Sequence, residues 1–245
     1  MPTPSPVLLA LETATETLRL GALTAGRVHT REGAGGAQAS VQLLPAVLAL
    51  LEETGLRLQD LDAIAFGRGP GAFTGLRTAC SVAQGLAFGA GKPVLPVDTL
   101  LIVAEAARRD GGAADVWVAQ DARMNEIYAA RYRHDGGRWH TLREPALYSA
   151  AALAERIAAE GGECLAGNAL ALHAEPWQAL ALQRLPDAVP DAAALLQLAA
   201  AGWSRGEAVD AALALPLYIR DKVAQTTAER EAAARAAAQD AGARP

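Results

Sequence analysis

Apolar and polar positions along the first hundred residues form short segments that predict strands and helices in regular succession. Residues 7–12 (VLLALE) are a continuous apolar run of strand length, and residues 17–23 (TLRLGAL) alternate as a hairpin partner would. The first helix is expected to have Ser40 as its cap and to end at Gly55. The prediction for this unit is strands at 7–12, 17–23 and 27–31, a helix at about 40–54, a strand at 62–66, a helix at about 74–88, a strand at 93–97 and a helix at 99–109.

The same succession starts again after the pair Gly111-Gly112. Residues 134–137 (HDGG) predict a hairpin turn between two of its strands. Two tandem units of three strands followed by alternating helix and strand indicate an α/β fold of two ribonuclease-H-like lobes, as in the actin, Hsp70 and sugar-kinase (ASKHA) superfamily. The predicted elements are strands at 116–122, 126–133 and 139–148, a helix at 150–160, a strand that ends in the loop CLAGN (164–168) and a helix at 191–205.

This pattern divides the chain into four regions, with the break between the lobes near residues 108–114. Residues 1–110 are expected to form the first lobe, and residues 111–190 the second. Residues 191–227 contain the last helix and the segment 216–224, which we expect to return to the first lobe. The tail, 228–245, is rich in Ala, Arg and Glu, so it is expected to be a frayed helix or disordered and is assigned no function.

The two helices of the first unit carry apolar residues on more than one side. In the first helix, Leu44, Leu48 and Leu51 share one side and Leu43, Val47 and Leu50 another, and only one side can serve the sheet. The other side either packs against helices of the same lobe or forms a partner interface, and the partner interface is the favoured interpretation. The residues expected to form it are Leu44, Leu48, Leu51, Leu76, Cys80 and Ala83.

Composition and charge narrow the possible functions. The chain of 245 residues is 51% hydrophobic, which is enough for a sizeable core, and its net charge is −5. A protein that holds nucleic acid by itself usually has a basic face, so tight binding by this chain alone is not expected. Two cysteines, Cys80 and Cys164, lie far apart and predict no disulfide scaffold. A signal-peptide pattern and a membrane-length apolar run are both missing, so a cytoplasmic protein is expected.

Several classes of active site find no support in the residues. The four histidines, at 29, 134, 140 and 173, include no pair at i, i+4 spacing, and we expect no metal site. A serine hydrolase needs an elbow of the GxSxG type, and none is present. Ser40 and Ser81 lie in predicted helices without a histidine placed to activate them. A peptidase is therefore the weakest of the functions considered.

Four segments carry a resemblance to a known family. They are LALETAT at 9–15, the long string AFGRGPGAFTGLRTACSVAQGLAFGAGKPVLPVDTL at 65–100, VAQDARMNEIYAARY at 118–132 and PLYIRDKVA at 216–224. In order and spacing these segments resemble the TsaB (YeaZ) family, and together they span most of the chain. The string GRGPGAFTGLR is long and therefore far more specific than a lone GxGxxG.

The resemblance implies a non-catalytic role in the synthesis of threonylcarbamoyladenosine (t6A) in tRNA. In that family, TsaB pairs with its paralogue TsaD, and the ATPase TsaE regulates the pair. The complex transfers a threonylcarbamoyl group from its adenylate to the adenosine beside the anticodon, and TsaD holds the active site. The resemblance further implies that the first-lobe helices of TsaB and TsaD pack together, that the same surface could form a homodimer without TsaD, and that tRNA is reached only through the complex.

A working enzyme of this fold holds nucleotide phosphates between two hairpin loops, and the resemblance places degraded versions of both in this chain. Glu12 stands where a metal-binding Asp would be, Ala14 replaces a Gly, and a bulky Arg123 stands where another Gly would let backbone meet phosphate. The third loop, Ala166-Gly167-Asn168, has one glycine instead of two. We expect no cofactor and negligible ATP turnover. The residues of this vestigial nucleotide cleft are Thr13, Thr15, Gly69, Gly71, Asp121 and Arg123.

Two features of the cleft leave alternatives open. The glycine-rich loop 67–71 opens onto a helix and is either an anion cradle or a tight strand-to-helix turn. Asp121 and Arg123 either close the cleft by a salt bridge or contact a nucleotide or a partner. Besides the partner role, an ATPase or small-molecule kinase of the same fold therefore remains the alternative function.

Overall fold

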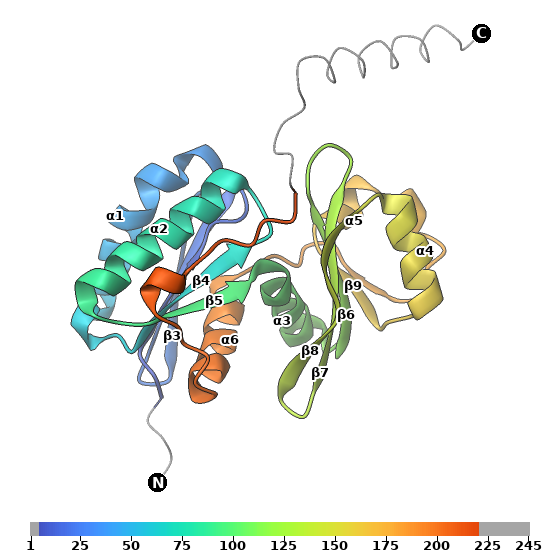
Figure 1. Ribbon diagram of the computed structural model, residues 1–245. Helices are drawn as coiled ribbons and strands as arrows, with labels where there is room; N and C mark the ends of the chain where they lie inside the picture. The colour runs from blue at the N-terminus through green and yellow to red at the C-terminus, as the bar shows by residue number, and fades with distance from the viewer. Residues whose placement is uncertain (1–4, 221–245) are drawn as a thin grey trace, which may run out of the picture.

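The computed structural model describes residues 5–220, which form two lobes, each built on a five-stranded sheet (Figure 1). The first sheet has the order β3-β2-β1-β4-β5, and the second has the order β8-β7-β6-β9-β10. In both sheets the first three strands are antiparallel and the last two continue in parallel. This repeated topology confirms the predicted α/β fold of two ribonuclease-H-like lobes. The strands are β1 (Leu8–Glu12), β2 (Thr17–Thr24), β3 (Arg27–Ala34), β4 (Ala63–Gly69), β5 (Val94–Asp98), β6 (Asp115–Asp121), β7 (Ile127–Asp135), β8 (Arg138–Tyr148), β9 (Cys164–Ala166) and β10 (Gln183–Leu185).

Helices cover both faces of the first sheet, so its central strands β1 and β4 are buried on both sides. The odd residues Leu9 and Leu11 of β1 belong to the core beneath α1 (Ala39–Thr54) and α2 (Phe73–Ala90). The even residues Leu8 and Ala10 belong to the core beneath α3 (Thr99–Gly111) and α6 (Ala192–Ser204). The period-2 alternation of a strand thus assigns each side chain to one of two helical layers.

Helix α3 joins the two lobes. Its Ile102 and Ala106 belong to the first-lobe core, whereas Leu100 and Val103 pack in a second-lobe core with residues of β6 and β7. Helix α4 (Ala150–Glu160) and the short α5 (Ala169–Leu172) cover the other face of the second sheet. Because α3 is buried on both sides, it acts as a shared wall between the lobes (Figure 1).

The structure corrects several predicted element boundaries. Helix α1 begins at Ala39 after Gln38, so Ser40 lies inside its first turn and is not the cap. Gly55 does end this helix, in the left-handed conformation (φ 67°) that glycine adopts most easily. Strand β4 continues to Gly69, into the predicted loop, because it pairs with β5 as far as Asp98. The sequence analysis missed α5 and β10, which are too short to show a period.

Strands of the first sheet end at Asp98 and those of the second begin at Asp115, while α6 lies against the first sheet. A division of the chain at residues 110 and 190 is a proposal that fits this arrangement. The second half of the segment 216–224 and the tail 228–245 lie outside the described residues. Within residues 5–220, no helix is long and apolar enough to cross a membrane.

Two glycines of α2 have opposite surroundings and allow a matched test of the packing. A Cβ on Gly75 would lie 1.9 Å from the carbonyl oxygen of Thr13, whereas a Cβ on Gly85 would meet no atom within 4 Å. We predict that Gly75→Ala lowers the free energy of unfolding by more than about 2 kcal/mol, because backbone atoms have to move. Gly85→Ala should raise it by about 0.5–1 kcal/mol, because alanine favours the helix. Chemical denaturation measures both, and equal stability of the two variants would contradict this packing.

Candidate functional site

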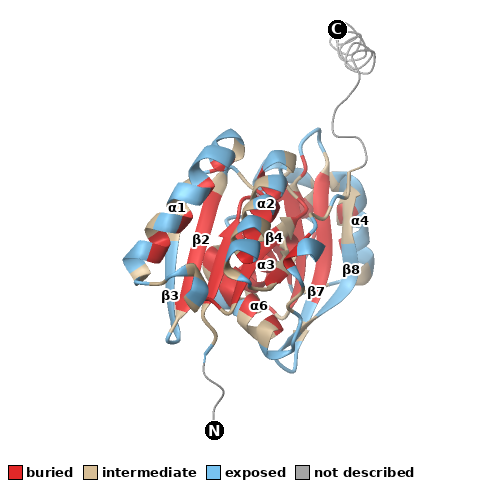
Figure 2. Ribbon diagram, turned by 60° about the vertical axis from the view of Figure 1, so that its left-hand side comes forward, coloured by how far each residue is buried: buried red, intermediate tan, exposed pale blue. Residues whose placement is uncertain are grey.

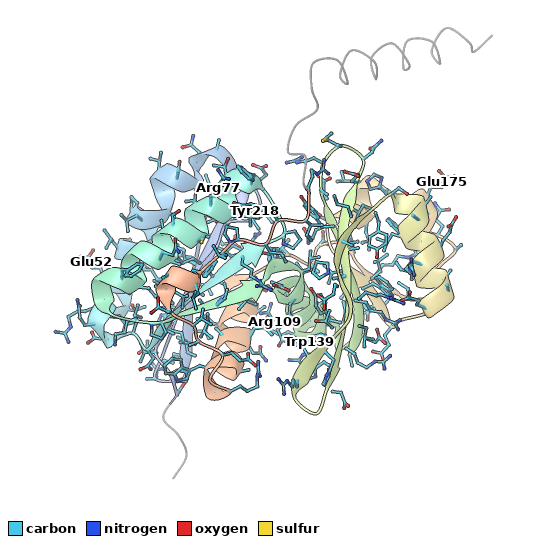
Figure 3. The ribbon with its side chains drawn as sticks, viewed as in Figure 1. Glu52, Arg77, Arg109, Trp139, Glu175 and Tyr218 are labelled. Carbon is cyan, nitrogen blue, oxygen red and sulfur yellow. The ribbon has the colours of Figure 1, made fainter. Side chains whose placement is uncertain are left out.

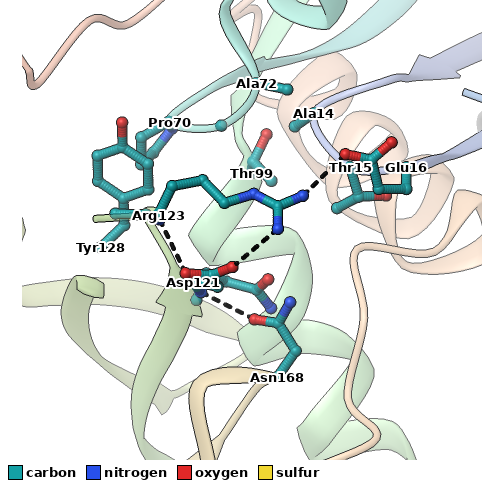
Figure 4. Close-up of a pocket in the computed structure, with 13 residues that line it drawn as sticks. Ala14, Thr15, Glu16, Pro70, Ala72, Thr99, Asp121, Arg123, Tyr128 and Asn168 are labelled. Carbon is teal, nitrogen blue, oxygen red and sulfur yellow. Dashed lines mark hydrogen bonds and ion pairs between the residues drawn. The ribbon is translucent and has the colours of Figure 1, made fainter. Parts of the chain in front are cut away.

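A small cleft lies between the lobes where the loop after β1, the start of α2 and the loop after β6 meet (Figure 4). Its volume is about 130 Å³, well below the roughly 300–1,000 Å³ of ordinary ligand pockets. Four predicted site residues line it, namely Thr15, Gly71, Asp121 and Arg123, whereas Thr13 and Gly69 lie behind its wall. The cleft is lined by Ala14, Thr15, Glu16, Pro70, Gly71, Ala72, Thr99, Gln120, Asp121, Ala122, Arg123, Tyr128 and Asn168.

The first hairpin loop turns its polar groups towards the protein. The N–H of Ala14 donates to Glu12 Oε1 (2.6 Å), and its carbonyl accepts from the N–H of Ala72 (2.9 Å). Thr13 Oγ1 donates to the carbonyl of Gly75 at the start of α2 (2.7 Å). These groups are satisfied internally, so the loop offers a ligand few of the donors that a phosphate needs.

Glycines make this close packing possible. A Cβ on Gly67 would lie 1.8 Å from Glu12 Oε2, and a Cβ on Gly71 would lie 2.6 Å from the Cβ of Ala14. The glycine-rich string is therefore needed so that β4 and the following turn can approach the first loop. These contacts favour the interpretation as a tight strand-to-helix turn over the anion cradle.

Glu12 is sealed beneath the cleft. Its side chain is fully buried, and burial raises the pKa of its carboxyl to about 7, against the opposing effects of the Ala14 N–H, the Thr99 hydroxyl and the charge of Arg19. Thr99 Oγ1 donates to Glu12 Oε2 and accepts from the N–H of Gly69, both at 3.2 Å. Between residues 5 and 220, no cluster of three or more His, Cys, Asp and Glu side chains is placed to hold a metal ion.

The second hairpin loop, Ala122–Glu126, carries an unusual backbone. Arg123, Met124 and Asn125 all adopt left-handed conformations (φ 63°, 56° and 60°), which cost about 1 kcal/mol or more per residue with a side chain. The N–H of Arg123 donates to Asp121 Oδ1 (2.8 Å). The surroundings must therefore hold this loop in place.

Arg123 reaches across the cleft to the other lobe. Its Nη2 donates to Glu16 Oε1 at 2.9 Å, and its Nη1 lies 3.6 Å from Asp121 Oδ2 (Figure 4). The ion pair that crosses the cleft is therefore Arg123–Glu16, whereas the contact between Arg123 and Asp121 stays within the second lobe. Because the side chains of Arg123 and Glu16 are 71% and 73% exposed, this pair stabilises the fold only weakly.

Several cleft residues escaped the sequence analysis, among them Glu16, Gln120 and Tyr128. The side chain of Gln120 is buried, and its Nε2 has no hydrogen-bond partner among the residues that the structure describes. No local pattern marks these positions, because each depends on contacts between the two lobes. Asn168 of the third loop does face the cleft, and its Oδ1 accepts from the N–H of Asp121 (2.8 Å).

The predicted partner surface is only partly exposed. Leu44 and Leu48 are 44% and 53% exposed on the outer side of α1, next to the 70% exposed Val41 (Figure 2). Phe88 at the end of α2 is 66% exposed. An open groove runs along the first half of α2 and is lined by Ser40, Phe73, Thr74, Arg77, Thr78, Ser81 and Val82.

The other four predicted interface residues are wrong, because Leu51, Leu76, Cys80 and Ala83 are buried in the core of the lobe itself. Cys80 and Ala83 pack in the core beneath α1 and α2, and Leu76 lies beside Gly69 at the end of β4. Leu51 shares a side with Leu44, but the chain turns back after Gly55, where the N–H of Leu56 donates to the carbonyl of Leu51 (2.9 Å). Leu56 and Leu58 then pack against the same core as Leu51. The exposed side of α1 is consequently shorter than predicted.

The burial of Glu12 predicts a pH dependence of stability. Its pKa of about 7 in the folded chain exceeds the value of about 4.3 expected when unfolded, so folding favours the protonated form. The contribution of protonated Glu12 to the free energy of unfolding is fully present below about pH 4.3 and is lost as the pH rises through 7. In Glu12→Gln this loss of stability between pH 5 and pH 7 should disappear. The slope of the free energy of unfolding against pH should therefore change by up to about 1.4 kcal/mol per pH unit. Denaturant titrations at several pH values measure it.

The matched control is Glu52→Gln on the exposed surface of α1 (labelled in Figure 3). It should keep the pH slope of the wild-type chain, because its carboxyl is not buried. If Glu12→Gln also keeps that slope, the assignment of the buried proton to Glu12 is wrong.

Comparisons with known proteins agree with this geometry. The family model described as TsaD, tRNA N6-adenosine threonylcarbamoyltransferase, matches residues 35–228. The tRNA threonylcarbamoyladenosine biosynthesis protein TsaB of Escherichia coli K12 is 34% identical over 227 residues, which cover 89% of this chain and 96% of that protein. TsaB of Haemophilus influenzae is 43% identical over 143 residues, or 56% of this chain and 60% of that protein. The structure of YeaZ from Pseudomonas aeruginosa is 39% identical, with a TM-score of 0.79 and coverage of 87% of this chain and 99% of that one. The chain therefore belongs to the TsaB family.

Proposed function

We propose that this chain is the non-catalytic partner of a TsaD-type protein in the complex that transfers a threonylcarbamoyl group from threonylcarbamoyl-adenylate to the adenosine next to the anticodon of tRNA. The names of its relatives place them in t6A biosynthesis. The observation that carries the non-catalytic role is the cleft, which is small, is spanned by the chain's own Arg123 and is bordered by loop groups that turn inward. The chain thus contributes a surface, and the partner contributes the chemistry.

The outer side of α1 supports pairing with another protein. Val41, Leu44 and Leu48 expose large apolar side chains on one side of a helix, and an apolar patch of this kind marks an association site. On the neighbouring α2, Gly85 and Gly89 are exposed, and a Cβ at either position would meet no atom. The lobe's own packing does not require these glycines, but small residues let a second helix approach closely.

Charge and family resemblance define the other partners of this proposal. A TsaE-type ATPase binds the pair, and tRNA is reached through the complex, since the net charge of −5 disfavours direct binding to phosphates. Without the TsaD-type partner, the same α1 and α2 surface forms a homodimer. Because tRNA is the substrate of the complex, the place of action is the cytoplasm.

An ATPase or small-molecule kinase would need an open phosphate site. The cleft of about 130 Å³ and the buried Glu12 disfavour such an enzyme. A serine peptidase would need a nucleophile elbow, and the sequence contains none.

Reconstitution separates the partner role from an enzyme's role. We predict that the TsaD-type protein, its regulator, threonylcarbamoyl-adenylate and tRNA yield t6A only when this chain is added. The chain alone should hydrolyse ATP far more slowly than the ~10 s⁻¹ of a median enzyme. Mass spectrometry of nucleosides and a phosphate-release assay measure the two quantities. Equal t6A formation without the chain, or ATP turnover near that median, would contradict the proposal.

Neighbouring leucines on α1 offer a paired test of the interface. Leu43 is fully buried in the core, whereas Leu44 is 44% exposed. Leu44→Glu should fold normally but fail to bind the TsaD-type partner, because an unpaired charge in a dry interface costs several kcal/mol, comparable to a micromolar affinity of ~8 kcal/mol. Leu43→Glu should unfold the lobe. Thermal melting and calorimetric titration with the partner measure these outcomes.

Gln59→Glu is the matched control, since it adds the same carboxylate at an exposed position outside α1. It should melt and bind like the wild-type chain. A folded Leu44→Glu variant that binds with unchanged affinity would place the interface elsewhere.

A further inference from the structure

Residues 214–220, here called the strap, cross from the first lobe to the second (Figure 1). At one end, Ala214 is buried in the first-lobe core, and at the other, Ile219 packs against the second-lobe core beside α3. Between them, the N–H of Leu217 donates to the carbonyl of Arg68 (2.7 Å) at the end of β4. The strap is thus a further connection between the lobes, in addition to α3 and the segment between β10 and α6.

On the first lobe, the strap is held by side chains of α2. Gln84 Nε2 donates to the carbonyl of Ala214 (3.1 Å). The ring of Tyr218 packs on Phe73 with 5.3 Å between centroids, and its hydroxyl accepts from Arg77 Nε (2.9 Å). Arg77 also lies 3.8 Å above the ring of Phe73, so the three side chains form one stack on the surface of α2 (Figure 3).

On the second lobe, the strap ends on the loop Ala122–Glu126. Arg220 Nη2 donates to the carbonyl of Ala122 (2.9 Å) and, at 3.3 Å, to that of Arg123, and it pairs with Glu126 Oε2 at 2.6 Å. The side chain of Arg220 is only 13% exposed, so these charge-assisted bonds are shielded from water. They hold the carbonyl groups of Ala122 and Arg123, where the left-handed segment begins.

The left-handed loop needs such an anchor. Its three left-handed residues all carry side chains, and a backbone of this kind persists only when its surroundings hold it. A pocket of about 170 Å³ lies between the strap, the start of α2 and this loop, and it adjoins the cleft at Arg123. The loop therefore has room to move when the anchor is lost.

We propose that the strap is a latch that couples helix α2 to the interlobe cleft. While Tyr218 is docked on α2, Arg220 holds the loop Ala122–Glu126 in its left-handed form and keeps Arg123 across the cleft at Glu16. When the strap leaves α2, the loop relaxes and the cleft opens. This coupling is a property of the single chain and does not depend on the proposed function. Tyr218 is 47% exposed beside α2. A molecule bound to that side of α2 is therefore positioned to contact Tyr218 and to change whether the strap is docked or released.

Hydrogen–deuterium exchange on the chain alone tests the latch. The N–H groups of Ala122, Arg123 and Glu126 are hydrogen-bonded within the closed loop and its flank, so their exchange reports loop opening. In Arg220→Met, exchange in the loop should rise about tenfold or more, as expected for the loss of charge-assisted hydrogen bonds. In Tyr218→Ala, which removes only the grip on α2, it should rise in the same direction by a smaller factor.

Arg205→Met is the matched control, because Arg205 pairs with the nearby Glu207 and contacts neither the strap nor the cleft loop. Exchange in β1 and β6 should stay unchanged in all three variants, which shows that the lobes remain folded. Unchanged loop exchange in Arg220→Met would overturn the latch. A rise in Arg220→Met without any rise in Tyr218→Ala would show that Arg220 acts locally, and the coupling to α2 would be wrong.

Discussion

The close packing of the loop after β1 on the first turn of α2 is the constraint on which the rest of the site depends. The Thr13 hydroxyl and the Ala14 carbonyl both form hydrogen bonds to backbone groups at the start of α2. The approach is so close that any side chain at position 75 would collide with the carbonyl of Thr13. This contact uses the Thr13 hydroxyl, a donor that could otherwise face a phosphate. It also fixes the start of α2, so that the helix runs across the sheet beside α1 (Figure 1).

The cleft between the lobes is small, and most of the polar groups around it are engaged in contacts within the chain. Burial raises the pKa of the Glu12 carboxyl to about 7, and Arg123 supplies a positive charge in the cleft from the chain itself. These contacts join the two lobes across the cleft. Helices α1 and α2 expose large apolar side chains, Val41, Leu44, Leu48 and Phe88, consistent with the partner role proposed for the chain.

The sequence predicted the fold well because strands and helices here have clear periods. The alternation at 17–23 and the apolar run at 7–12 correspond to β2 and β1, and Gly55 marked the end of α1. The site was harder to predict because its contacts are long-range: Arg220 lies 98 residues from Ala122, and Tyr218 lies 141 residues from Arg77. Leu51 shows the same limit, since the turn back at Gly55 decides its burial. A helix that is apolar on several sides indicates two packing surfaces, but the sequence does not say which one faces the sheet.

The central claim is that this chain contributes a surface and not a reacting group. Its most direct test compares initial rates of t6A formation in the reconstituted complex for Glu12→Gln and Leu48→Glu. The first variant removes the carboxylate at the place of a metal-binding Asp, and the second puts a charge on the outer side of α1, where Leu48 is 53% exposed. The account predicts that Glu12→Gln keeps the wild-type rate within about twofold, a difference below roughly 0.5 kcal/mol in barrier, while Leu48→Glu loses almost all of it. A large loss in Glu12→Gln together with a normal rate in Leu48→Glu would contradict it.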